Sequence, residues 1–171
     1  MFGPLALRSV AFAAVLGIVA APATALAAGD TVQLQVVSIR ATKTNSDISP
    51  QLKPLVDALK KTFKYTGYKL LGSETRKAAF NKGVPIALAG NYRARITPIE
   101  KKDNRIKLKV EVFERKGKEQ VSKLSTTISL AAGKNQLFGG WKLDGDDVLI
   151  IAVSAKYLPG ARTSSKLKVK S

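Results

Sequence analysis

The sequence predicts an α+β fold in which one amphipathic helix packs on a curled, mainly antiparallel sheet. Three observations support this class. Segment 49–67 has apolar residues at helical spacing, several later segments alternate apolar and polar residues as strands do, and segment 148–153 is apolar throughout. The expected order is strand, helix, strand and then a β-meander that closes on the final strand.

The predicted helix has both a start signal and an end signal. Ser49 and Pro50 suit the N-cap and the first helical position, and Gly67 can end the segment. Its apolar face consists of Leu52, Leu55, Val56, Leu59 and Phe63. A strand is expected before the helix at 31–39 and another after it, so the order allows one right-handed crossover.

Alternating patterns place the remaining strands. They are expected at 68–71, continuing irregularly toward 80, at 84–88, 92–100, 105–115 and 121–130, joined by short polar turns. Pro85 marks an edge strand, and Gly139 and Gly140 indicate a kink or bulge. The final strand, 148–153, has no polar face, which predicts burial on both sides: the helix covers one, and the curled sheet covers the other.

Aligning the apolar residues of the hairpins predicts which residues lie opposite one another. The expected pairs are Ile96–Val110, Arg95–Glu111, Arg93–Phe113, Val110–Leu124 and Glu111–Lys123. One carboxylate would then bridge two cations across three strands, at no more than about 1 kcal/mol for each exposed pair. This structural role is one interpretation of Arg93, Arg95 and Lys123, and a binding role is the other.

The N-terminal segment is typical of an export signal. Arg8 precedes the charge-free apolar stretch 10–20, and small residues precede an expected cleavage between Ala27 and Ala28. The alternative is an uncleaved membrane anchor, because 10–28 is almost long enough to span a bilayer. The predicted organisation is a signal peptide at 1–27, a single α+β domain at 28–158 without a further membrane span, and a basic disordered tail at 159–171.

Catalysis and cofactors are disfavoured by composition. The chain has no histidine and no cysteine, which excludes Ser-His-Asp and Cys-His catalysis, imidazole ligands and thiolate ligands. Three aspartates, Asp144, Asp146 and Asp147, could hold calcium, but their spacing does not match a calcium loop and favours an Asp–Gly turn. A hydrolase that uses two carboxylates is the least favoured class, and no metal or cofactor is predicted.

The charge predicts the partner. The chain has 29 Lys and Arg against 12 Asp and Glu, and removal of residues 1–27 leaves 28 − 12 = +16. We expect a non-catalytic exported protein, periplasmic or extracellular, that binds an anionic envelope polymer or lipid surface. The candidate binding residues are Lys53, Lys60, Lys61 and Lys64 on the helix and Lys166, Lys168 and Lys170 in the tail.

Two other interpretations of this composition stay open. The protein could be a structural or interaction subunit of an envelope assembly that pairs through an edge strand. Alternatively, the lysines could serve solubility only. Nucleic acid is a disfavoured partner, because an exported chain meets little of it and no base-stacking motif is present.

Overall fold

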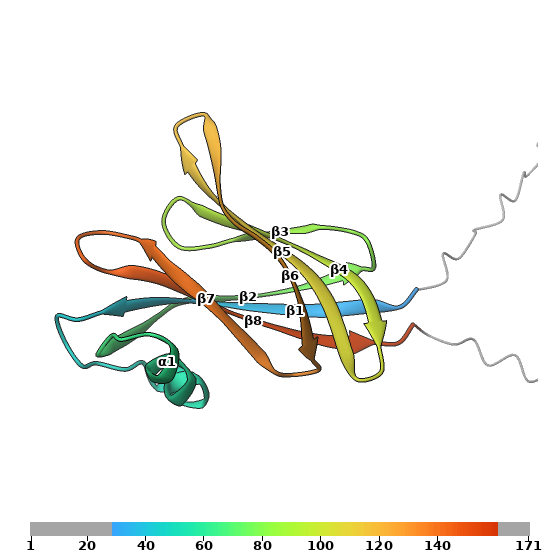
Figure 1. Cartoon of the computed structure of the whole chain (residues 1–171), viewed down its shortest axis with the longest axis horizontal. Helices are drawn as coiled ribbons and strands as arrows, with labels where there is room; N and C mark the ends of the chain where they lie inside the picture. Colours follow the sequence, from blue (N-terminus) through green and yellow to red (C-terminus); the bar gives the residue numbers. More distant parts are fainter. Residues whose placement is uncertain (1–28, 161–171) are drawn as a thin grey trace, which may run out of the picture.

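Two four-stranded antiparallel sheets pack face to face in the computed structural model, which describes residues 29–160 (Figure 1). Sheet A has the strand order β2-β1-β8-β7, and sheet B has the order β3-β4-β5-β6. The elements are β1 (Thr31–Thr42), the 3₁₀ helix η1 (Pro50–Leu55), α1 (Val56–Thr62), β2 (Gly67–Ala79), β3 (Val84–Ala87), β4 (Tyr92–Lys102), β5 (Arg105–Lys116), β6 (Glu119–Ala131), β7 (Asn135–Lys142) and β8 (Val148–Leu158).

Strand β8 is buried on both faces, as its unbroken apolar sequence predicts. Ile151 and Val153 point into the core between the two sheets, whereas Ile150 and Ala152 pack in a second core beneath the helical segment. A helix on a mainly antiparallel sheet is therefore confirmed. The curled sheet is only partly confirmed, because a separate second sheet, and not a continuation of the first one, covers the inner face.

The predicted single helix is divided into two short pieces. Pro50–Leu55 is a 3₁₀ helix, and only Val56–Thr62 is α-helical. Pro54 lies inside the 3₁₀ segment, where its missing N–H and its ring disfavour α-helical hydrogen bonding to the preceding turn. The helix also ends earlier than Gly67, because Phe63 is already extended with φ −124° and ψ 134°.

No crossover connects the first two strands. β1 and β2 are antiparallel neighbours, so the helical segment lies on the outer face of sheet A as a long connection between them. Tyr68, which is fully buried, fixes its end: the hydroxyl donates to the carbonyls of Phe63 at 3.0 Å and Tyr65 at 3.2 Å. Burial raises the pKa of Tyr68.

The edge strand and the kink appear where the sequence predicts them. β3 contains Pro85 and ends sheet B. The register of β7 shifts between Gly139 and Trp141, and Gly140 has φ +98°, a conformation that favours glycine. β2 continues without interruption to Ala79, with a register shift against β1 at Ser38.

One predicted hairpin register is confirmed and the other is wrong. Ile96 lies opposite Val110, and Arg95 and Arg93 lie opposite Glu111 and Phe113, as expected. In the next hairpin Val110 lies opposite Thr126 and Glu111 opposite Ser125, an offset of two residues from the expected pairing. Since side chains alternate with period two, the offset keeps residues 124–130 on their expected faces but removes the expected Glu111–Lys123 contact. Beyond the register shift between Val112 and Phe113 the alternation changes, so residues 119–122 do not keep their expected faces.

Several sequence predictions fall outside the described residues. The signal peptide with its cleavage between Ala27 and Ala28 lies there, as do Lys166, Lys168 and Lys170. Within residues 29–160, no helix is long and apolar enough to cross a membrane.

Candidate functional site

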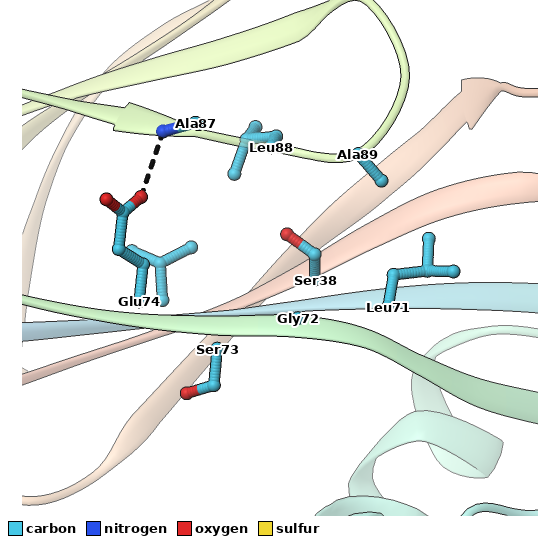
Figure 2. A pocket seen from close by; sticks show the side chains of 9 residues that line it. Ser38, Leu71, Gly72, Ser73, Glu74, Ala87, Leu88 and Ala89 are labelled. Carbon is cyan, nitrogen blue, oxygen red and sulfur yellow. Dashed lines mark hydrogen bonds between the residues drawn. The ribbon is translucent and has the colours of Figure 1, made fainter.

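A small cavity opens where the edge strands of the two sheets, β2 and β3, face each other (Figure 2). It has a volume of about 290 Å³, and its walls include Ser38, Leu71 and Leu88. Glu74 reaches across from β2: one carboxylate oxygen accepts the backbone N–H of Ala87 at 2.9 Å, and the other accepts Nε of Arg76 at 2.9 Å. The carboxylate therefore holds the two edges together and is already engaged by donors.

The inner side of β1 becomes polar toward the end of the sandwich where Arg40 lies. Its guanidinium is 3.3 Å from a carboxylate oxygen of Asp147 and 3.5 Å from one of Asp144. The chain turns here as the Asp–Gly pattern predicts, with Gly145 at φ +62° and the N–H of Asp147 donating to the carbonyl of Asp144 at 3.2 Å. Arg40 thus compensates two of the clustered carboxylates, and a metal cation would have to compete with it.

A second charged group lies near this end, on the inner side of the β5–β6 hairpin. Glu114 accepts Nζ of Lys123 at 2.8 Å and lies 3.6 Å from Nζ of Lys116. The hydrogen bond from Lys123 holds the pKa of Glu114 below its usual value, and the same bond raises the pKa of Lys123. A general acid needs a raised carboxyl pKa, so Glu114 is poorly suited to that role.

Tyr92 shares this environment and joins the two sheets. Its hydroxyl donates to the carbonyl of Lys142 at 2.8 Å, and its ring centre lies 6.3 Å from that of Trp141. Burial raises the pKa of Tyr92, with a further contribution from the charge of Glu114. These contacts give the residue a structural role in closing the sandwich.

The outer face of sheet B carries a basic surface that two neighbouring strands build. We call it the basic face. Its cations are Arg93 and Arg95 on β4 and Arg105, Lys107 and Lys109 on β5, all exposed. Beside them β6 presents a row of exposed hydroxyls, Ser125, Thr127 and Ser129. The helical segment packs on the other sheet, so no helix within residues 29–160 covers this face (Figure 1).

The pairing of charges on the basic face differs from the sequence prediction. Lys107 and Lys109 pair with Glu100 and Glu111, each at 3.0 Å. Among the described residues, no ion pair involves Arg93, Arg95 or Arg105, although Arg105 Nε donates to the Ser129 hydroxyl at 3.0 Å. The structural interpretation of Arg95 as an ion-pair partner of Glu111 is therefore wrong, since Lys109 takes that carboxylate. Arg93 lies opposite Phe113 as predicted, and it has no carboxylate partner among residues 29–160.

Lys123 also fails to pair with Glu111, but for a different reason. Val112 lies opposite Leu124 and Phe113 opposite Ser122, which leaves Lys123 as the extra residue of a bulge. A bulge re-aims its side chain, and Lys123 reaches Glu114 and not Glu111. Lys123 is therefore structural, but through a different partner from the one predicted.

The lysines predicted on the helix do not form a single helical flank. Lys60 and Lys61 belong to α1, whereas Lys53 lies in the 3₁₀ segment and Lys64 follows the end of the helix. All four side chains are exposed, and α1, with the 3₁₀ segment before it, packs on the face of sheet A that points away from sheet B (Figure 1). They are a second basic surface, separate from the basic face.

Sequence reasoning did not single out the basic face as a site. Its signal was present in the sequence, because Arg105, Lys107 and Lys109 alternate with buried Ile106 and Leu108 and so must share one side of a strand. What the sequence could not show is that this side stays uncovered. The contact of Arg40 with the aspartate turn has no sequence signal, since the residues are more than 100 positions apart.

Comparison with known proteins identifies no family. No protein-family model and no curated protein matches the chain. Several solved structures match the chain, among them two secretins that resemble it weakly. One is the T2SS secretin XcpQ from Pseudomonas aeruginosa, with 10% identity and a TM-score of 0.36 over 75% of this chain and 58% of that chain. The other is the InvG secretin domain β-barrel from the Salmonella SPI-1 injectisome, with 11% identity and a TM-score of 0.32 over 80% of this chain and 65% of that chain. The chain spans less than two thirds of either, and at these TM-scores the likeness does not establish a shared fold.

Proposed function

We propose that this chain is an exported, non-catalytic binding protein whose basic face binds an anionic polymer, with an acidic polysaccharide as the ligand class. The observation that carries the proposal is the set of three arginines, Arg93, Arg95 and Arg105, that lie exposed on an uncovered sheet without a carboxylate partner among the described residues. Guanidinium groups suit carboxylate and phosphate recognition, because they present several donors in a fixed plane.

The shape of the basic face favours a linear polymer. Cations on one strand face repeat every second residue, about 7 Å apart, so β4 and β5 present two parallel rows. The hydroxyls of Ser125, Thr127 and Ser129 extend this surface with neutral hydrogen-bonding groups, which suit sugar hydroxyls. The five cations named above, set against Glu100 and Glu111, give a local charge of 5 − 2 = +3.

A lipid surface is the less favoured anionic partner. Insertion of an amphipathic helix into a bilayer needs a free apolar face, but that of the helical segment, including Leu52 and Leu59, is buried against sheet A. Among the described residues, Val121 is the only large hydrophobic side chain that is exposed.

Binding of polymers and vesicles at two salt concentrations tests the proposal. We expect the purified protein to bind polygalacturonate at low salt and not to bind neutral dextran. Most of the binding to polygalacturonate should be lost at physiological salt, because screening shortens the range of the electrostatic attraction from about 30 Å to about 8 Å. Equal binding to both polymers would refute the proposal. Stronger binding to anionic lipid vesicles than to polygalacturonate would replace the ligand class. Deletion of 161–171 measures the share of the tail lysines.

A second candidate function is a structural or interaction subunit of an envelope assembly. The observation that favours it is strand β6, which ends sheet B and is 13 residues long. A long open edge can accept a further strand. An assay of association through this edge, run beside the polymer-binding assay, would separate this function from the first one.

A further inference from the structure

The four sheet edges differ in how well they are protected against pairing with another chain. β3 is four residues long and contains Pro85, and β7 is interrupted by its glycine bulge. β2 has a register shift and is bonded to β3 through the carboxylate of Glu74. β6 has a bulge and a charge at Lys123, but the eight-residue stretch that follows, Leu124–Ala131, has no charge, proline, glycine or register shift. Natural edge strands usually carry such protective residues, so their absence here needs an explanation.

The backbone groups that β6 presents to the open edge can be assigned from two hydrogen bonds. The N–H of Ala132 donates to the carbonyl of Asn104 at 3.1 Å, so even-numbered residues of β6 bond to β5. The N–H of Arg115 donates to the carbonyl of Asn91 at 2.8 Å, which directs odd-numbered residues of β5 to β4 and agrees with this assignment. Antiparallel strands alternate these directions. Ser125, Thr127 and Ser129 therefore point their N–H and C=O groups away from the sheet.

The exposed stretch is nearly a palindrome. Residues 124–130 read Leu-Ser-Thr-Thr-Ile-Ser-Leu, which is symmetric about Thr127 except that Thr126 corresponds to Ile128. Two copies that pair antiparallel about a two-fold axis at Thr127 therefore place like with like. Leu124 faces the partner's Leu130, and Ser125 faces the partner's Ser129. A two-fold interface requires this kind of self-complementarity.

We infer that strand β6 is a dimerisation edge, at which a second copy of this chain pairs through residues 124–130. The three outward-facing residues of each strand form roughly six inter-strand hydrogen bonds. Leu124 and Ile128, which are half-buried in one copy, gain apolar neighbours from the other. Lys123, the nearest cation on this side, lies opposite the partner's Ala131, so no two cations meet within the paired stretch.

The dimer joins both copies of sheet B into one continuous sheet, and the two basic faces lie on the same side of it. This inference names the partner for the open edge of the second candidate function, and it does not depend on polymer binding. The two properties respond to salt in opposite directions: both copies are strongly basic, so added salt weakens their repulsion and favours the dimer while it weakens polymer binding.

Disulfide trapping tests the edge and its register. The chain has no cysteine, so each single substitution gives one thiol. In Thr127→Cys the two thiols lie on directly opposite residues, whose Cα atoms are about 5.5 Å apart in a hydrogen-bonded pair, within the disulfide range. Ser125→Cys and Thr75→Cys, the latter on β2, are controls. Of the three variants tested separately, we expect only Thr127→Cys to form a disulfide dimer. A mixture of Ser125→Cys and Ser129→Cys should also form one, because these two positions lie opposite each other in the dimer. No dimer, or equal dimer in the Ser125→Cys and Thr75→Cys controls, would overturn the inference.

A second experiment uses the unmodified edge. Light scattering should show a dimer, and its dissociation constant should decrease as the NaCl concentration is raised from 50 to 500 mM. Thr127→Lys would put two cations opposite each other and should raise that constant at least tenfold, whereas Thr75→Lys adds the same charge to an exposed position of β2 and should not. A monomer at every salt concentration, or equal effects of both substitutions, would refute the inference even if polymer binding were intact.

Discussion

Replacement of Ile150 by alanine tests whether both faces of sheet A are covered. Ile150 is fully buried beneath the helical segment, in the core that contains Leu52 and Leu59. The change removes three carbons, or about 2.4 kcal/mol at about 0.8 kcal/mol for each. The cavity left behind adds to this, so we expect a total loss of about 3–4 kcal/mol.

The neighbouring residue gives the matched comparison. Ile151 is also fully buried but faces sheet B, so Ile151→Ala should cost about the same. Urea unfolding followed by the fluorescence of Trp141, the only tryptophan of the chain, measures both. Lys156→Ala, at an exposed position of the same strand, should change stability by less than about 0.5 kcal/mol.

The comparison separates this fold from an ordinary sandwich. An antiparallel sheet with a solvated outer face loses little from truncation on that face. A cost below about 1 kcal/mol for Ile150→Ala, beside a cost above about 2 kcal/mol for Ile151→Ala, would therefore refute the packing of the helical segment on sheet A.

Three further predictions concern the bulge, one charge pair and processing. Gly139→Ala should cost about 1–3 kcal/mol in urea unfolding, because its Cβ would lie 2.7 Å from the backbone of β8, whereas Gly72→Ala, with no atom within 4 Å, should be nearly neutral. Glu114→Gln should destabilise the protein at pH 7 but not at low pH. Because the pKa of Glu114 is lowered in the folded state, the charged carboxylate stabilises the fold above its usual pKa of 4.5, and this stabilisation is lost as pH falls through the folded-state pKa. Equal losses of stability at pH 7 and pH 3 would contradict the role of Lys123. The exported protein should begin at Ala28, and an intact mass that includes residues 1–27 in the membrane fraction would establish an anchor instead.

The hairpin registers show what a sequence pattern can and cannot determine. Apolar alignment of β5 and β6 permits only even sums of residue numbers, because both partners must face the core. The tight turn at Gly117, with φ +62°, instead places Lys116 opposite Glu119, an odd sum. The extra residue of the bulge at Lys123 raises the sum by one, from 235 to 236. The even sum is restored, but it is two above the 234 of the simplest alignment. The pattern predicts each face, but the turn and the bulge set the register.

Other causes limited how accurately the helix and the candidate site could be predicted from the sequence. Helical spacing identified Leu52, Leu55 and Leu59 as buried, which is confirmed, but the effect of Pro54 on the first turns divides the segment and separates Lys53 from Lys60. The apolar run of β8 predicted cover on both faces without showing what supplies it. Long-range packing also decides which strand faces remain open, and hence where the basic face lies.

The most direct test of the proposed function is the affinity for polygalacturonate of two charge-matched variants. One replaces Arg93, Arg95 and Arg105 by Gln on the basic face, and the other replaces Lys60, Lys61 and Lys64 by Gln on the opposite side. At about 1 kcal/mol for each cation near an anionic surface, the arginine variant should bind about 100-fold more weakly than the unmodified protein at low salt, while the lysine variant should lose only the few-fold that follows from a lower net charge. Equal losses, or a larger loss in the lysine variant, would contradict binding by the basic face.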